Sequence, residues 1–151
     1  MLGQEAILTK AAKTMNKSFP KTILIAEDDE ASRIFLRLFL VEEGFNVIEA
    51  KNGAEAVSLA RQENPDLILT DLHMPELDGI SAVRQIRSDE KLRDIPILAM
   101  SGDGRRGMEL FLNMDDLGTG YINYLTKPLS MSAVIEQINM LLPSHRFTFA
   151  P

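Results

Sequence analysis

The 151-residue sequence has no cysteine, no tryptophan and only two histidines. The absence of cysteine excludes disulfides, thiol chemistry and cysteine-ligated zinc. No stretch approaches the roughly 20 apolar residues of a membrane-spanning helix, and the N-terminus lacks the apolar core of a signal peptide. The 16 lysines and arginines are outnumbered by 22 aspartates and glutamates, which argues against a phosphate-binding basic surface. We therefore expect a cytoplasmic protein that binds neither nucleic acid nor a membrane directly.

What is present is typical of one globular domain, with 45% hydrophobic and 25% charged residues. We divide the chain into an N-terminal extension (1–20), a domain (21–142) and a C-terminal tail (143–151). Apolar residues recur at helical spacing in the extension: Ile7, Leu8, Ala11, Ala12 and Met15. This indicates either a frayed leader or a short amphipathic helix. Such a helix would dock on a neighbour or on its own domain, at apolar surface around Leu36 and Leu40.

From residue 21 onward, short apolar runs alternate with segments of helical character. The predicted strands are 22–26, 45–50, 67–70, 96–100 and 124–126. The predicted helices are 31–43, 54–63, 80–88, 108–115 and a last one that Ser130 caps and that extends to 142. This alternation predicts an α/β fold of the (βα)5 flavodoxin-like type, a doubly wound parallel sheet with strand order 2-1-3-4-5.

Polar side chains follow the predicted strands at their carboxyl ends. Glu27 and Asp28 follow the first strand, Asp71 the third, Ser101 the fourth and Lys127 the fifth. Because the carboxyl ends of parallel strands share one edge of the sheet, we expect these side chains to meet in a single crevice.

Three carboxylates in one crevice repel one another unless a cation lies among them. Oxygen ligands without cysteine suit a hard ion such as Mg²⁺. Ser101 and Lys127 are then available to bind an anionic group beside Asp71. The arrangement predicts phosphoryl transfer to Asp71.

Four motifs in this sequence resemble the receiver domains of two-component response regulators, over roughly residues 21–142. They are ILIAEDD at 23–29, DLILTDLHMP at 66–75 followed by Asp78 and Gly79, IPILAMS at 95–101, and YLTKP at 124–128. Each motif alone is weak, but the four in this order are specific. The resemblance implies the flavodoxin-like fold already predicted from the strand pattern.

The resemblance also implies roles for the acidic residues. Asp71 would be the phosphoacceptor, receiving a phosphoryl group from the histidine of a histidine kinase or phosphotransfer protein. Asp28, Asp71 and the backbone carbonyl of His73 would ligate Mg²⁺. Glu27 would act through a water molecule or position the metal.

The remaining motif residues would sense the phosphoryl group. Ser101 and Lys127 would contact its oxygens, and Tyr124 matches the aromatic switch position, which would turn inward as Ser101 moves. The Lys127–Pro128 bond matches one that is often cis in this family. We expect the partner-binding face to carry Arg105, Arg106, Tyr121 and Tyr124.

Two further side chains lie near the predicted phosphoryl group in sequence. His73 is two residues past Asp71, and Asp103 is two residues past Ser101. A side chain at either position could affect the access of water to that group.

The implied function is a phosphorylation-dependent signalling switch that acts on a downstream protein and is not an enzyme with an external substrate. The alternatives left open are a stand-alone regulator, a receiver fragment of a larger hybrid kinase or multidomain regulator, and a homodimer. A Mg²⁺-dependent aspartyl-phosphate hydrolase is disfavoured, since such phosphatases carry Asp-x-Asp whereas Asp71 is followed at the second position by His73. The presence of Asp71, Asp28 and Lys127 argues against a receiver-like module that is not phosphorylated.

Overall fold

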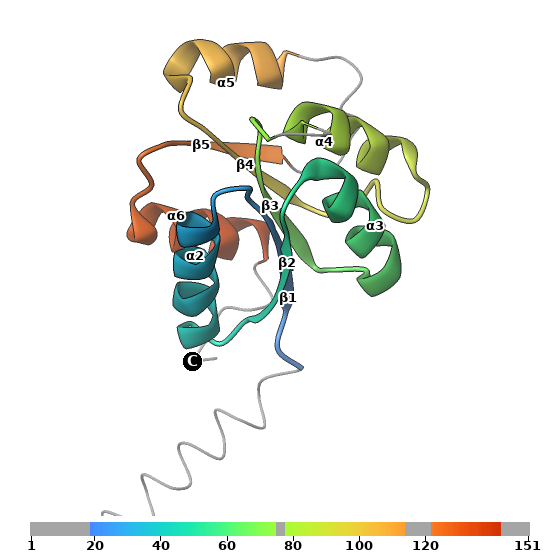
Figure 1. Cartoon of the computed structure of the whole chain (residues 1–151), viewed down its shortest axis with the longest axis vertical. Helices are drawn as coiled ribbons and strands as arrows, with labels where there is room; N and C mark the ends of the chain where they lie inside the picture. Colours follow the sequence, from blue (N-terminus) through green and yellow to red (C-terminus); the bar gives the residue numbers. More distant parts are fainter. Residues whose placement is uncertain (1–18, 75–77, 114–121, 143–151) are drawn as a thin grey trace, which may run out of the picture.

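The computed structural model of the chain describes residues 19–74, 78–113 and 122–142 (Figure 1). These residues form a parallel sheet in the order β2-β1-β3-β4-β5. The strands are β1 (Thr22–Ala26), β2 (Asn46–Ala50), β3 (Leu67–Asp71), β4 (Ile97–Ser101) and β5 (Ile122–Thr126). The predicted fold class and strand order are both confirmed.

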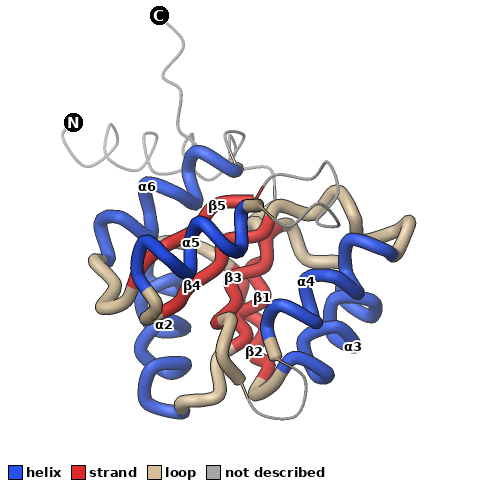
Figure 2. The backbone as a smooth tube through the Cα atoms, turned by 90° about the horizontal axis from the view of Figure 1, so that it is seen from above, coloured by secondary structure: helices blue, strands red, loops and turns tan. Residues whose placement is uncertain are grey.

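Helices cover both faces of this sheet, as Figure 1 and the view from above in Figure 2 show. They are α2 (Glu30–Glu42), α3 (Gly53–Glu63), α4 (Gly79–Ser88), α5 (Gly104–Leu112) and α6 (Met131–Leu141). Helices α2 and α6 pack on one face, and α3, α4 and α5 on the other. Right-handed crossovers between parallel strands produce this division.

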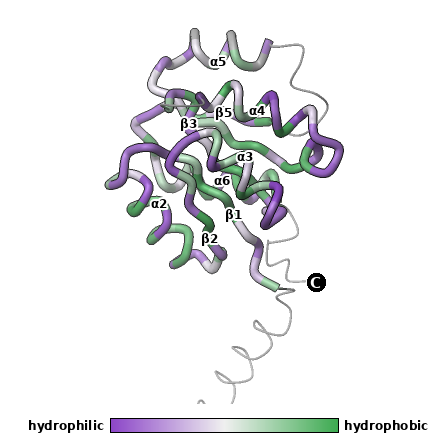
Figure 3. The backbone as a smooth tube through the Cα atoms, turned by 45° about the vertical axis from the view of Figure 1, so that its right-hand side comes forward, coloured by the Kyte–Doolittle hydropathy of each residue, from purple (hydrophilic) through white to green (hydrophobic). Residues whose placement is uncertain are grey.

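The alternating direction of side chains along a strand divides the core into two layers. In β1, Ile23 and Ile25 pack with the side chains of α2 and α6, whereas Leu24 and Ala26 pack with those of α3 and α4. Every residue of β3 and β4 is buried. The strands are mostly hydrophobic in Figure 3 because both of their faces are covered.

Helix α2 carries more apolar residues than its packing on the sheet uses. Leu36 and Leu40 are buried against the sheet, whereas Phe35, Leu38 and Val41 are each more than half exposed. Leu36 and Leu40 therefore belong to the core, and the prediction that they offer a surface to the N-terminal extension is wrong. The unused apolar side chains are on the outer side of the helix.

Polar caps start most of the described helices. The side chains of four preceding residues accept a hydrogen bond from a backbone N–H in the first turn: Asp29, Asn52, Asp78 and Ser130. Asp103, which precedes α5, makes no such bond. Its carboxylate is engaged elsewhere, as shown below.

Two elements begin more than one residue from the predicted start. Helix α5 begins at Gly104, four residues before the predicted start, since Gly102 and Gly104 gave that segment the composition of a loop. Strand β5 begins at Ile122, two residues early, because pairing with β4 extends it. Residues 114 and 115 of the predicted fourth helix lie outside the described residues.

Several predictions concern residues that the structure does not describe. They are the helix in residues 1–18, the C-terminal tail and the placement of Tyr121 and of the Arg106 side chain on the partner-binding face. Within the described ranges, no helix combines the length and apolar character required to cross a membrane.

Candidate functional site

The predicted polar residues come together at the carboxyl edge of the sheet. Glu27 and Asp28 follow β1, and one carboxylate oxygen from each lies within 4.8 Å of an oxygen of Asp71 at the end of β3. The Lys127 ammonium, which follows β5, lies 2.7 Å from Oδ2 of Asp71. Ser101 ends β4, and its backbone carbonyl accepts a 2.8 Å hydrogen bond from the backbone N–H of Lys127. Glu27, Asp28, Asp71 and Lys127 therefore meet at this edge of the sheet, as the strand ends predicted.

Asp71 is a buried carboxylate, with 5% of its surface exposed. Its Oδ2 accepts the hydrogen bond from Lys127, and its Oδ1 accepts one of 2.9 Å from the backbone N–H of His73. Burial alone raises the pKa of Asp71, but hydrogen bonds from Glu27, Lys127 and the His73 N–H outweigh burial and lower it. Asp71 is therefore ionised at neutral pH.

Glu27 differs from Asp71 although the two carboxyl groups are neighbours. It is 2% exposed, and its Oε1 and Oε2 lie 3.4 and 3.3 Å from the Lys127 ammonium. Burial, the hydrogen bond to Asp71 and the negative charge of Asp71 together raise the pKa of Glu27 to about 7, although Lys127 opposes the shift. Burial lowers the pKa of Lys127, but its interactions with Asp71 and Glu27 raise it overall. Below about pH 7, a proton on Glu27 and the charge on Lys127 thus relieve the repulsion among the acids.

The three carboxylates fit a Mg²⁺ ion in both chemistry and spacing. Asp28 is exposed, so the cluster is accessible from solvent. Oxygens bound to Mg²⁺ at about 2.1 Å lie about 3–4 Å apart, so carboxylates within 4.8 Å need only a small movement to share the ion. The ligand roles of Asp28, Asp71 and the His73 carbonyl, and the water-mediated role of Glu27, stay predictions.

The Asp78–Gly79 motif keeps the backbone close to Asp71. The Gly79 N–H donates to the Leu72 carbonyl at 3.2 Å. A Cβ atom added at Gly79 would overlap the Asp71 carbonyl oxygen. Glycine is therefore required here to bring α4 against the end of β3.

The two predicted switch residues are in different environments. Ser101 is 1% exposed, and its Oγ accepts a 3.1 Å hydrogen bond from the Asp103 N–H. The Tyr124 ring lies 6.1 Å from the ring of Phe111 between centroids, and its hydroxyl is buried with no hydrogen-bond partner among the described residues. This hydroxyl is close to Gly107 in α5, so the ring already points inward.

Sequence reasoning missed two contacts around the cluster. The Nε2 atom of His73 lies 2.6 Å from Oδ2 of Asp103. The sequence placed each residue near the phosphoryl group but did not predict that the two contact each other. Arg33 was not singled out, although it is buried and donates a 3.0 Å hydrogen bond to the Glu27 carbonyl. The available signal was an arginine next to the apolar run of this helix, although Arg37 carries the same signal. The Lys127–Pro128 bond is cis, as the resemblance implied.

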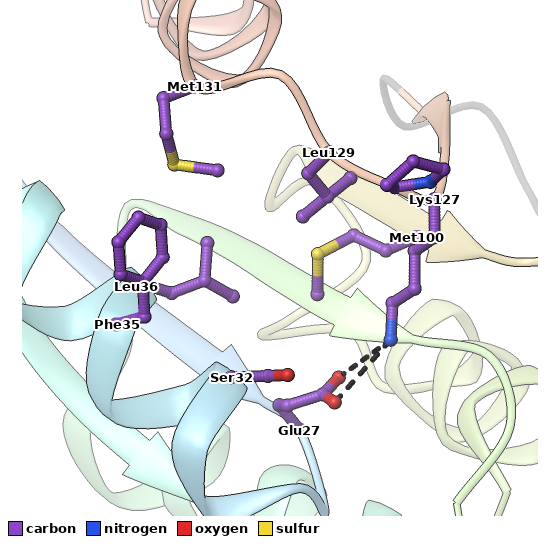
Figure 4. Close-up of a pocket in the computed structure, with 9 residues that line it drawn as sticks. Glu27, Ser32, Phe35, Leu36, Met100, Lys127, Leu129 and Met131 are labelled. Atoms are coloured by element: carbon purple, nitrogen blue, oxygen red, sulfur yellow. Dashed lines mark hydrogen bonds and ion pairs between the residues drawn. The ribbon is translucent and has the colours of Figure 1, made fainter.

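An apolar groove of about 270 Å³ adjoins the acidic cluster (Figure 4). Its polar lining is Glu27, Ser32 and Lys127, of which Glu27 and Lys127 also belong to the cluster. Its apolar lining comes from α2, β4 and the segment that leads into the start of α6: Phe35, Leu36, Met100, Pro128, Leu129 and Met131. The groove therefore extends the site toward the outer side of α2.

Comparison with curated proteins identifies relatives over nearly the whole domain. The polar-differentiation response regulator DivK of Brucella anthropi is 34% identical over 123 residues, which cover 82% of this chain and 97% of that protein. DivK of Brucella ovis is 34% identical over 122 residues, with 81% and 96% covered.

Solved receiver domains have the same fold. The receiver domain of the Francisella response regulator 1452 is 29% identical, with a TM-score of 0.71 over 83% of this chain and 99% of that one. The receiver domain of the sensor histidine kinase PA1611 from Pseudomonas aeruginosa is also 29% identical. Its TM-score is 0.72 over 82% and 98% of the two chains, and it holds a magnesium ion in its active-site cleft.

A family model described as the response regulator receiver domain matches residues 23–139. That range includes every residue of the acidic cluster together with Ser101 and Lys127. With the parallel sheet, the cluster at its carboxyl edge and these relatives, the match shows that the chain belongs to the response-regulator receiver family, the signalling domains of two-component systems.

Proposed function

We propose that the domain, residues 21–142, is a phosphorylation-dependent switch in which Asp71 accepts a phosphoryl group from the phosphohistidine of a histidine kinase or phosphotransfer protein. Asp28, Asp71 and the His73 carbonyl would hold Mg²⁺, with Glu27 acting through water. The observation that carries the proposal is the meeting of three carboxylates within 4.8 Å beside an ammonium group 2.7 Å from Asp71. We place this exchange in the cytoplasm.

Because its pKa is lowered, Asp71 is ionised, and the carboxylate is the form that attacks phosphorus. A carboxylate oxygen of Asp71 forms the new P–O bond while the P–N bond to the donor imidazole breaks, and the bonding electrons remain on that nitrogen. Lys127, already in contact with Asp71, would then neutralise one of the phosphoryl oxygens. Bound Mg²⁺ would supply further charge neutralisation for the same group.

The phosphodonor protein is the occupant that we propose for the apolar groove. A histidine can reach Asp71 only if its protein covers the rim of the site, and the groove shares Glu27 and Lys127 with that rim. Phe35, 57% exposed, supplies an apolar contact for the donor. Phe35→Ser should lower the rate of transfer from a donor protein and leave labelling by a small phosphodonor unchanged.

Ser101 is the proposed link between the phosphoryl group and the partner-binding surface. Its hydroxyl would leave the Asp103 N–H and donate to a phosphoryl oxygen, which would move the turn that leads into α5. Because Tyr124 already points inward, phosphorylation would stabilise this packing rather than create it. Ser101→Ala should still accept phosphate at Asp71 but lose most of the change in affinity for the downstream protein.

Labelling with acetyl phosphate and Mg²⁺ tests the central proposal. Intact-mass measurement should show one added phosphoryl group on the wild type and on Asp94→Asn, an exposed acid used as a matched control. Asp71→Asn should show none. Asp28→Asn should weaken Mg²⁺ binding, followed through amide chemical shifts. Labelling of Asp71→Asn equal to that of the wild type would contradict the assignment.

A further inference from the structure

Arg33 is a charged side chain within the interior of the domain, with only 6% of its surface exposed. Its Nη1 donates a 3.0 Å hydrogen bond to the Glu27 carbonyl, and its Nε lies 3.5 Å from Oε1 of Glu49 on β2. Burying a guanidinium is costly unless its charge and its donors find partners. These two contacts explain why an arginine is tolerated at this position.

The carbonyl bound by Arg33 belongs to the peptide group that joins Glu27 to Asp28. On the other side of Glu27, its N–H donates to the last carbonyl of β2 at 3.1 Å. Asp29 then caps α2 by accepting a 2.9 Å hydrogen bond from the Ser32 N–H. The two acidic residues are thus held at both ends, and Arg33 fixes the peptide plane between them.

We propose that Arg33 is a positioning residue for the metal site, which orients the Glu27–Asp28 peptide and thereby both carboxylates. Glu49, in turn, orients the guanidinium. Arg33 does not touch the metal or the phosphoryl group, and this inference rests on the proposed function of the cluster. Its prediction is that the affinity for Mg²⁺ depends on the geometry of the guanidinium and not only on its charge.

A purely electrostatic role for Arg33 predicts the opposite sign. Removing a positive charge near three carboxylates strengthens the binding of a cation, because the repulsion between the arginine and the ion is lost. Removing a positioning contact weakens binding, because Asp28 then samples orientations that do not ligate the ion. The direction of the change in Mg²⁺ affinity therefore distinguishes the two roles.

Arg37 provides a matched control. Its Nε lies 3.6 Å from the same Oε1 of Glu49, but its side chain is 41% exposed. Among the described residues it makes no hydrogen bond to Glu27. Arg37→Met thus removes the same charge from the same acid and leaves the Glu27–Asp28 peptide unchanged.

The test measures Mg²⁺ affinity by amide chemical shifts and, in parallel, thermal unfolding of the metal-free protein. Arg33→Met should weaken Mg²⁺ binding on the order of tenfold. Arg33→Lys should weaken it too, since a single nitrogen cannot occupy the positions of both Nη1, which donates to the carbonyl, and Nε, which lies against Glu49. In metal-free protein, the Asp28 amide signal should move in both variants and not in Arg37→Met. If Arg33→Met does not fold, Glu49→Gln is the alternative variant, since Glu49 is partly exposed. It should lower the Mg²⁺ affinity less than Arg33→Met would.

The inference is overturned if the Arg33→Lys and Glu49→Gln variants bind Mg²⁺ as tightly as the wild type or more tightly. Unchanged Mg²⁺ affinity together with a loss of thermal stability would make Arg33 a purely structural contact. Failure of the proposed function is distinguishable, since the wild type itself would then fail to bind Mg²⁺ or to be labelled on Asp71.

Discussion

The imidazole of His73 and the carboxylate of Asp103 form a 2.6 Å contact between the segment after β3 and the turn after β4. Asp103 precedes α5, where other helices of the domain have a capping side chain, but its carboxylate makes no cap. Its backbone N–H meanwhile donates to Ser101. One residue thus connects the segment beside Asp71 to the start of α5.

We predict that this contact prolongs the life of the phosphoryl group on Asp71. His73→Ala and Asp103→Asn should each accelerate its hydrolysis several-fold, because the contact restricts the approach of water. The phosphoryl group of the double variant should hydrolyse no faster than that of either single variant, since each substitution removes the same contact. Decay of the label is followed by intact mass, with Glu109→Gln, on the exposed part of α5, as the control. Additive effects would show that the two side chains act independently.

Lys127 should have opposite effects on metal binding and on phosphorylation. Lys127→Met removes the ammonium 2.7 Å from Asp71, so Mg²⁺ should bind several-fold more tightly, because like charges no longer repel. The rate of labelling by acetyl phosphate should nevertheless fall, by about tenfold or more, since a charge-assisted hydrogen bond to the phosphoryl group is lost. Titration and labelling kinetics measure the two quantities separately. A parallel loss of both would indicate that Lys127 mainly holds the cluster together.

The stability of the metal-free protein should fall as pH rises from about 5 to 8. Glu27 has a folded-state pKa of about 7, above its ordinary value of 4.5. Its stabilising contribution is therefore complete below pH 4.5 and is lost as the group ionises in the folded protein, a change of about 3 kcal/mol at most. Asp71 has a lowered pKa and contributes in the opposite direction, but only at more acidic pH.

Urea unfolding at several pH values, without Mg²⁺, checks this prediction. Glu27→Gln should remove the fall between pH 5 and 8, because the amide carries no proton to lose. Added Mg²⁺ should restore wild-type stability at pH 8. A wild-type profile that stays flat over this range would place the proton of the cluster elsewhere.

Gly107 should control the position of Tyr124. A Cβ atom added at Gly107 would lie 2.6 Å from the Asp103 Cβ and 2.9 Å from the Tyr124 hydroxyl. Gly107→Ala should therefore displace the tyrosine ring and destabilise the protein, although alanine favours a helix by about 1 kcal/mol over glycine. Ring signals of Tyr124 and thermal unfolding report the change. Gly102→Ala, where the added atom meets nothing within 4 Å, is the control.

The sequence by itself determined the fold and the membership of the acidic cluster. Short buried runs alternating with helical segments allow few arrangements once crossovers are right-handed. The parallel sheet then brings together the residues at the carboxyl ends of β1, β3 and β5, which is why Asp28, Asp71 and Lys127 were predictable. Their contacts depend on strand order, which the alternation of strands and helices restricts to a few possibilities.

The tertiary structure decided what depends on contacts between distant segments. It placed Leu36 of α2 in the core and Phe35 on the outer side. Because apolar residues cover more than one side of this helix, its sequence alone does not define which side packs on the sheet. It paired His73 with Asp103 from 30 positions away, and set Arg33 against the Glu27 carbonyl. It also raised the pKa of Glu27 to about 7 and lowered that of Asp71, since burial and neighbouring charge set a pKa and both exist only in the folded chain.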